Sequence, residues 1–439
     1  MKSKKRYVLL GSLVFLCLFL YPFFLKAQDL LKSQPAKHNL SNGMTLIYQK
    51  DGSSATSVVN ILIKGGKRRE PEGKEGVAFM ATRLCLELPH QQILQRLMNQ
   101  ATQRTYFCRH DFSLIRVSCL SENLEDAVEL STQLLREPLI SGMRIDRIKD
   151  IMNHSRKLQE DEPVNAAHTA ALESLFHGSP YAGSSYGTEE SLKEIKKRDV
   201  EDYFDTFFRA GNMIVSVSTD LEEEKTLNIM QPYLEEIADG NAPEASPISW
   251  VPHEEKNTYI EKDSEQTLVF MAFPLPAISR ENFLNATMLQ NLLGKGMNSK
   301  LWPLRTEKKL AYIVNSRAFP MKEGGLLEVY LETDRAKKDT AFKELDTIIQ
   351  DLYRNGISAE EFRVTKILSK GMIIRENETK DAKTYNLAFM EALGLGYDFL
   401  NLMVSDMEAI SLELFNSYIR SVLDPENAVS IAVGPNQRP

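Results

Sequence analysis

The chain repeats one pattern of residues after a shift of 215 positions, and this repeat constrains the fold more than any other feature. Residues 203–218 read YFDTFFRAGNMIVSVS and residues 418–433 read YIRSVLDPENAVSIAV, so that Tyr203 aligns with Tyr418 and Asn212 with Asn427. In both copies a helix-like stretch leads into a polar turn and then into a run of Val, Ile and Ala that is typical of a strand. Two related halves, each containing helices and strands, are therefore predicted.

The two halves are separated by a segment with the composition of a linker. Residues 238–252 read ADGNAPEASPISWVP, which combines three prolines with Gly, Asn and Ser and has no apolar period. Each half opens with a strand-like run, and each contains one clear amphipathic helix. These runs are at 57–64 and 266–273, and the helices at 122–135 and 339–353, the latter stopped by Gly356. We predict an α+β fold with helices packed on mostly antiparallel sheets, divided into 1–28, 29–237, a linker at 238–256, and 257–439.

The composition excludes several classes of protein. Apolar residues make up 43% of the 439 residues and charged residues 26%, which is ordinary for a globular protein and rules out a disordered, fibrous or polytopic membrane chain. The net charge of −7 shows no basic excess, so nucleic acid is not an expected partner. Four cysteines in this length do not form a disulfide scaffold, and buried thiols are expected.

The first 28 residues have the organisation of an export signal. A basic segment at 2–6 precedes an apolar run from Tyr7 to Leu25, and Ala27 offers a cleavage point. The run is also long enough to span a bilayer, so a cleaved signal peptide and an uncleaved anchor both remain open. Either way we expect an exported protein, periplasmic or anchored in the inner membrane and facing the periplasm, with membrane contact only through this segment.

A series of motifs across the mature chain resembles one enzyme family. It begins with L-S-N-G-M-T-L at 40–46, reaches a helix start at 76–78, and continues through LLGKGMNSKLWPLRTEKKLAY at 292–312 to AVGP at 432–435. In this order the motifs resemble the pitrilysin/insulinase family of inverted-zincin metallopeptidases, which includes mitochondrial processing peptidase. The resemblance implies two homologous α+β domains that form a clamshell around a peptide-sized chamber.

The family's zinc motif, H-x-x-E-H on a helix, is missing where the resemblance places it. Phe79 and Arg83 stand in place of the two histidines, and Thr82 in place of the general-base glutamate. The further glutamate ligand falls on Ser155, with Glu160 the nearest carboxylate. A threonine hydroxyl does not ionise near neutral pH, and a guanidinium repels a dication. We therefore expect no metal in this chain, and an ion pair between Arg83 and a carboxylate such as Glu160.

The remaining residues offer no clear substitute for the zinc motif. None of the seven histidines is four residues from another, and the chain has no G-x-S-x-G motif. Cys108 and His110 are two residues apart on a predicted strand, where ordinary packing is favoured over metal binding. His154 and Ser155 are adjacent on a predicted helix, so their side chains diverge.

Two other features of the family are kept in part. Arg305 and Tyr312 follow the pattern R-x-x-x-x-x-A-Y, and in the family such residues act from the domain opposite the zinc, where they bind the substrate backbone and stabilise the oxyanion. The alternative is a solvated or ion-paired Arg305 and a buried Tyr312. The resemblance also places a peptide-binding strand edge at Thr105, Tyr106 and Phe107, although the family's Asn-Ala pair is replaced by Thr-Tyr. Plain sheet packing is the alternative for these three residues.

The sequence therefore predicts a non-catalytic subunit of an exported two-chain metallopeptidase. Such a subunit would bind a peptide or unfolded protein, and it would supply Arg305 and Tyr312 in trans to a zinc-bearing homologous partner, with zinc only in that partner. The isolated chain is expected to be inactive. A stand-alone peptide-binding or scaffolding pseudopeptidase of the cell envelope is the alternative, and a metallopeptidase with unorthodox ligands is a third.

Overall fold

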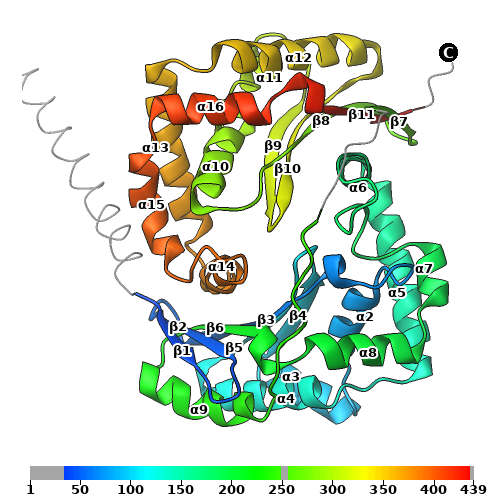
Figure 1. Cartoon of the computed structure of the whole chain (residues 1–439), viewed down its shortest axis with the longest axis vertical. Helices are drawn as coiled ribbons and strands as arrows, with labels where there is room; N and C mark the ends of the chain where they lie inside the picture. The colour runs from blue at the N-terminus through cyan, green and yellow to red at the C-terminus, as the bar shows by residue number, and fades with distance from the viewer. Residues whose placement is uncertain (1–33, 249–255, 436–439) are drawn as a thin grey trace, which may run out of the picture.

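The chain folds into two mixed sheets that are covered by helices (Figure 1). A computed structural model describes residues 34–248 and 256–435. The strand order is β1-β2-β6-β3-β5-β4 in the first sheet and β7-β11-β8-β10-β9 in the second. Neighbouring strands are antiparallel except for one parallel pair in each sheet, β2 with β6 and β7 with β11. The predicted α+β class with mostly antiparallel strands is confirmed.

The elements of the first half contribute the first sheet and most of its helices. Its strands are β1 (Ala36–Asn39), β2 (Thr45–Lys50), β3 (Thr56–Lys64), β4 (Gln103–Cys108), β5 (Phe112–Leu120) and β6 (Met213–Thr219). Its helices are α2 (Val77–Leu84), α3 (Gln91–Asn99), α4 (Leu124–Arg136), α5 (Gly142–Asp161), α6 (Pro163–Leu175), α7 (Glu189–Glu194), α8 (Lys197–Phe207) and α9 (Glu223–Glu235). Short 3-10 turns are η1 (Lys67–Arg69), η2 (Ser121–Asn123) and η3 (Ala210–Asn212).

The second half repeats this order with local differences. Its strands are β7 (Asn257–Glu261), β8 (Gln266–Pro274), β9 (Ile313–Met321), β10 (Gly324–Asp334) and β11 (Val429–Gly434). Its helices are α10 (Arg280–Gly294), α11 (Trp302–Thr306), α12 (Lys338–Asn355), α13 (Ala359–Glu376), α14 (Lys380–Ala392), α15 (Phe399–Ala409) and α16 (Leu412–Val422). The 3-10 turns are η4 (Arg335–Lys337) and η5 (Pro425–Asn427).

The repeat read from the sequence corresponds to a repeated structural unit. Helix α8 ends at Phe207 and α16 at Val422, and the turns η3 and η5 follow three residues later in both copies. The strands β6 and β11 then enter the two sheets beside β3 and β8, respectively. The predicted helix at 339–353 is α12, which ends against Gly356 at a φ of 68° as expected for a helix stop.

The two halves exchange one helix each to complete their cores. Helix α6 leaves the first half and packs Ala167, Ala171 and Leu172 on the face of the second sheet that is turned towards the first half. Helix α14 leaves the second half and packs Leu387 and Ala388 on the face of the first sheet that is turned towards the second half (Figure 1). Because a sheet with two apolar faces needs a cover on each, neither half can bury its own sheet alone.

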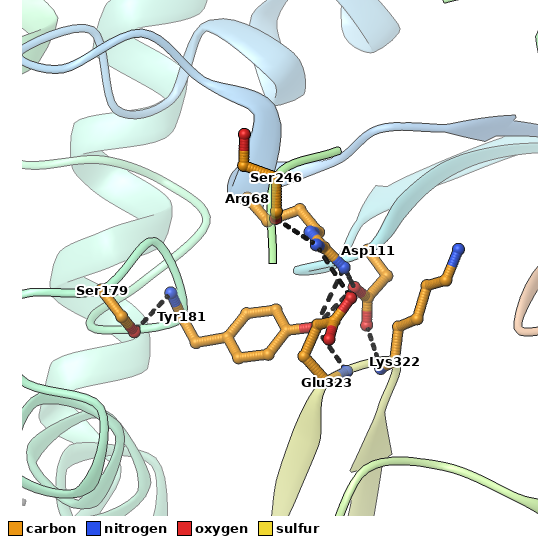
Figure 2. A network of polar contacts seen from close by, with 7 residues as sticks. All are labelled: Arg68, Asp111, Ser179, Tyr181, Ser246, Lys322 and Glu323. Carbon is orange, nitrogen blue, oxygen red and sulfur yellow. Dashed lines mark hydrogen bonds and ion pairs between the residues drawn. The ribbon is translucent and has the colours of Figure 1, made fainter. Parts of the chain in front are cut away.

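A buried polar network also joins the two halves at the tips of their central hairpins (Figure 2). The guanidinium of Arg68 pairs with Asp111 at 3.1 Å and with Glu323 at 3.4 Å, and the side chains of Arg68 and Asp111 are 4% and 7% exposed, against 32% for Glu323. Asp111 also accepts hydrogen bonds from the Tyr181 hydroxyl at 2.7 Å and from the Lys322 backbone N–H at 2.9 Å. The β4–β5 turn is therefore tied to the β9–β10 turn by charge-assisted bonds that are shielded from water.

The two halves interlock through these contacts, and the expected clamshell around a peptide-sized chamber stays a prediction. At their junction the described residues line a cavity of about 350 Å³, whose lining includes His110, His168, Phe319 and Tyr385. That volume lies at the lower end of the range for small-molecule pockets, roughly 300–1,000 Å³.

The prediction about the export segment falls on residues outside the described ranges, whereas the prediction about buried thiols can be checked. The export segment at 1–28 and linker residues 249–255 lie outside the described residues, so the signal and anchor alternatives both stay predictions. In the ranges that are described, no helix combines the length and apolar character needed to cross a membrane. Cys85, Cys108 and Cys119 are free and buried, as expected.

Substituting Arg68 by Met should destabilise the protein far more than removing an exposed ion pair. The substitution leaves the Asp111 side chain, which is 7% exposed, without its counter-charge, and this costs about 3–5 kcal/mol. The matched control is Arg363→Met, which removes the exposed pair with Glu360 and should cost less than about 1 kcal/mol. Urea unfolding measures both values, and equal losses would contradict a network that joins the halves.

Candidate functional site

Helix α2 carries the residues that the family resemblance aligns with a zinc motif, and the chain fixes its start closely. Gly76 precedes it with a φ of 102°, and a Cβ added there would lie 2.9 Å from Met152 Cε and 3.1 Å from the Tyr186 carbonyl oxygen. Only glycine tolerates that conformation and that contact without strain. The Oε1 atom of Glu70 accepts a hydrogen bond from the Ala78 N–H at 2.9 Å, which caps the helix.

The first and fourth positions of the vacated motif are filled by packing. Phe79 is buried, with ring centroids 5.2 Å from Tyr106 on β4 and 4.8 Å from Tyr186. Thr82 is fully buried, and its hydroxyl donates to the Ala78 carbonyl at 2.8 Å. Neither side chain offers a lone pair of the kind that zinc binds, because one is a hydrocarbon ring and the other hydroxyl is engaged by the backbone.

Arg83 forms an ion pair with Glu87, which corrects the expected pairing with Glu160. The Arg83 Nη1 atom lies 2.7 Å from Glu87 Oε1, and the guanidinium carbon lies 5.5 Å from the centroid of the Tyr106 ring. Glu160 pairs instead with Arg156 one turn earlier on α5, at 2.7 Å. Glu87 follows Arg83 by four residues, and this i,i+4 spacing is the signal in the sequence that could have indicated the pair.

Glu87 is the centre of a larger cluster. Arg147 forms an ion pair with its carboxylate, and Arg144 Nε lies 3.6 Å away. The Glu87 side chain is only 7% exposed, whereas those of Arg83, Arg144 and Arg147 are 23%, 30% and 55% exposed. Arg144 and Arg147 are three residues apart on α5, a spacing that places them on one side of the helix and is the signal in the sequence that could have indicated them.

The structure does not place a metal-binding group at this helix. Ser155 lies half-buried on α5, three residues after the buried Met152. With a phenyl ring, a bonded hydroxyl, an ion-paired guanidinium and a serine, the four positions do not fit the nitrogen, sulfur and carboxylate ligands of zinc. Among the described residues, no three His, Cys, Asp or Glu side chains gather in a way that could hold a metal ion.

The predicted peptide-binding segment forms the open edge of the first sheet. Thr105, Tyr106 and Phe107 lie in β4, which pairs only with β5 among the described strands. Tyr106 faces α2, whereas Phe107 faces α14 and lies 5.9 Å from Tyr385. His110 lies beyond the end of β4 in the turn, so the prediction that Cys108 and His110 share a strand is wrong.

Arg305 and Tyr312 lie in the second half and are both exposed. Arg305 is on the short helix α11, with its guanidinium carbon 5.1 Å from the centroid of the Trp302 ring. Tyr312 precedes the edge strand β9, and its side chain is 64% exposed. The alternative of a buried Tyr312 is therefore excluded. The turn between the two residues is strained at Lys309, which adopts a φ of 50° where the family usually has glycine.

The fold, together with a motif helix beside an open strand edge, defines a two-sheet peptidase-type protein. A family model described as "Insulinase (Peptidase family M16)" matches residues 45–189, and one described as "Peptidase M16 inactive domain" matches residues 194–368. The chain belongs to the peptidase M16 (insulinase/pitrilysin) family.

Two curated relatives cover most of the chain. It is 22% identical over 402 residues to "Non-peptidase homolog YmxG" of Helicobacter pylori, with 90% of this chain and 92% of the relative covered. It is 21% identical over 345 residues to an "Uncharacterized zinc protease" of Rickettsia felis, with 77% and 83% covered. The names of relatives therefore include both a zinc protease and a non-peptidase.

Solved structures share the same fold at low identity. A peptidase M16 inactive domain from Pseudomonas fluorescens has a TM-score of 0.83 at 18% identity and covers 92% of this chain and 99% of its own. A chain of Complex III2 from Candida albicans has a TM-score of 0.79 at 18% identity, covering 91% and 95%. The periplasmic protease PqqL from Escherichia coli has a TM-score of 0.75 at 12% identity, and this chain covers 48% of it.

Removing Glu87 should cost more stability than removing Arg83. Glu87→Ala leaves three arginines facing one another without a counter-charge, whereas Arg83→Ala leaves Glu87 two partners. We expect a loss of about 3 kcal/mol for Glu87→Ala and about 1 kcal/mol for Arg83→Ala in urea unfolding. Added salt should restore part of the first loss by screening the repulsion. A larger loss for Arg83→Ala would contradict the central position of Glu87.

The pH dependence of stability should report on Glu70. Burial raises the pKa of its carboxyl to about 8, against the opposing effects of the Gly76 and Ala78 N–H groups and of Lys67. Between the unfolded pKa near 4.5 and the folded pKa, only the folded state keeps the proton, so the free energy of unfolding falls as pH rises through this window. Glu70→Gln should flatten that fall, measured by urea unfolding at pH 5 and pH 8. The exposed control Glu72→Gln should leave it unchanged.

Proposed function

We propose that this chain is the zinc-less subunit of a two-chain peptidase. It would pair with a homologous zinc-bearing chain, hold a peptide or unfolded protein, and present Arg305 and Tyr312 to the partner's active site. The observation that carries the proposal is the contrast between the two sites. The metal position is closed by Phe79, Thr82 and the Arg83–Glu87 pair, whereas Arg305 and Tyr312 stand exposed where only another molecule could use them.

The chemistry of the two exposed groups suits transition-state stabilisation. A guanidinium and a phenol both donate hydrogen bonds to an oxygen on which negative charge develops, and such donors act most strongly where water is excluded. Closure by a second chain would exclude water around them. The described cavity at the junction of the two halves is about 350 Å³, and pairing with a second chain would provide a larger enclosed space for a peptide.

The comparisons support pairing of two such units. The periplasmic protease PqqL is about twice the length that this chain matches, which suits two units of this fold in one polypeptide. Another neighbour is a chain of a multi-subunit assembly, Complex III2. We extend the proposal to location: the basic and apolar segment at 1–28 favours export, with the protein periplasmic or anchored in the inner membrane.

The second candidate is a stand-alone peptide-binding or scaffolding protein. Two observations favour this candidate: packing closes the positions of the zinc motif, and one relative is named a non-peptidase homolog. This candidate gives no role to the exposed hydrogen-bond donors of Arg305 and Tyr312. The two candidates differ in one measurable respect, because only the first requires a zinc-bearing partner.

The test is purification of the full chain from its native envelope, followed by zinc analysis and a peptidase assay with a quenched unfolded peptide. We expect a complex with a homologous zinc-bearing chain and activity that a chelator removes. Arg305→Ala and Tyr312→Phe should each lower kcat by about 10²–10³ with assembly retained, and Arg363→Ala should not.

Different failures would separate the candidates. Chelator-sensitive cleavage by the isolated chain would overturn the zinc-less assignment. An unchanged kcat in Arg305→Ala would remove the role in trans. Recovery of the chain without any zinc-bearing partner would favour the scaffold.

A further inference from the structure

The arginines around Glu87 form a positively charged cluster beside the open edge of the first sheet. Arg83, Arg144 and Arg147 surround one carboxylate, so these four side chains alone carry a net charge of +2 (three positive, one negative). This contrasts with the whole chain, whose net charge is −7. Three guanidiniums gathered on one carboxylate have more hydrogen-bond donors than its oxygens can accept.

A fourth arginine adds to the cluster from the sheet itself. Arg104 lies on β4, and its guanidinium donates to the Cys85 carbonyl at 2.7 Å. Its Nε atom is buried and has no hydrogen-bond partner among the described residues. Burial and the nearby charge of Arg83 lower its pKa to about 10, which still leaves it charged at neutral pH. The excess positive charge on the more exposed Arg83, Arg144 and Arg147 leaves donors for a further acceptor.

The cluster lies on the α2 side of the first sheet, where every second side chain of a strand added to β4 would point. Side chains alternate along a strand, so Arg104 and Tyr106 share the α2 face of β4, while Thr105 and Phe107 share the α14 face. A peptide added to the open edge would lie about 4.8 Å from β4 and would direct every second side chain to the α2 face. Arg83, stacked over the Tyr106 ring, lies on that face.

The acidic residues of the neighbouring helix form no ion pair with the cluster among the described residues. Asp146 and Asp150 are exposed on α5, and although Asp150 follows Arg147 by three residues, Arg147 pairs with Glu87 instead. Glu87 is therefore the acidic side chain that the structure places within ion-pair distance of Arg83, Arg144 and Arg147.

We infer that the cluster of Arg83, Arg104, Arg144 and Arg147 is a carboxylate-binding site for an acidic peptide added along β4. The inference rests on the proposed peptide-binding function and names the chemistry of its ligand. A guanidinium binds carboxylate oxygens in a bidentate fashion but cannot activate water as a metal ion does. Positive charge is thus kept close to the vacated metal position, in a form that holds a peptide without cutting it.

The test uses fluorescein-labelled extended peptides of alternating Thr and Val with Glu, Gln or Lys at every fourth position, each with an amidated C-terminus. Fluorescence anisotropy with the full chain should show the Glu peptide binding about tenfold more tightly than the Gln peptide, and the Lys peptide more weakly still. A Gln peptide with a free C-terminal carboxylate distinguishes the two sources of the same group. Hydrogen exchange should show protection of 103–108 when the Glu peptide binds.

Variants that remove positive charge, and one that removes negative charge, test whether the cluster causes the preference for the Glu peptide. Arg144→Gln with Arg147→Gln should reduce the Glu-over-Gln preference to about twofold and weaken its salt dependence, with the affinity for the Gln peptide unchanged. Glu87→Gln removes the internal competitor and should increase the preference. Arg363→Gln is the matched control on the surface, and thermal unfolding checks that each variant is folded.

The outcomes separate this inference from the proposed function. Equal affinity for the Glu and Gln peptides, with protection of β4 retained, would overturn the carboxylate site and leave peptide binding standing. Absence of binding by every peptide, with no protection at β4, would overturn both. A preference that persists in the double arginine variant would place the acidic selectivity elsewhere and would also overturn the site.

Discussion

The exchange of helices α6 and α14 is the contact on which the rest of the structure depends. Each sheet has an apolar face turned towards the other half that its own half leaves uncovered, and the other half supplies the helix that covers it. Burial of apolar surface is the main driving force for such packing, so the two sheets become parts of one cooperative unit. The Arg68–Asp111–Glu323 network then fixes how the two central hairpins meet.

The interlocking bears on whether the two halves of the chain can open, which the sequence repeat alone does not answer. Duplicated halves suggest two bodies that could open and close around a ligand, but shared cores oppose such motion because opening would expose the sheet faces that α6 and α14 cover to water. The small cavity at the junction is a consequence of the packing.

At the candidate site the zinc-binding side chains of the family are absent, although the helix that carries them in the family is kept. Gly76, Glu70 and the buried stripe of α2 hold the helix against the sheet and α5. The residues at the family's ligand positions have become part of an aromatic contact, a backbone hydrogen bond and an ion pair. Positive charge remains nearby, carried by arginines instead of a metal ion, and this changes what the site can do from activating water to binding anionic oxygen.

The sequence by itself determined the repeat, the α+β class, the main helices and strands, and the loss of the zinc ligands, because each follows from the local pattern or from the identity of single residues. Arg83 was expected to form an ion pair, and the i,i+4 spacing of Arg83 and Glu87 was a local signal for the partner that the expectation of Glu160 did not use. The helix exchange, the exposed position of Tyr312 and the gathering of four arginines beside β4 were decided only by tertiary structure. The helix exchange and the arginine cluster bring together residues far apart along the chain, and no local periodicity records such contacts.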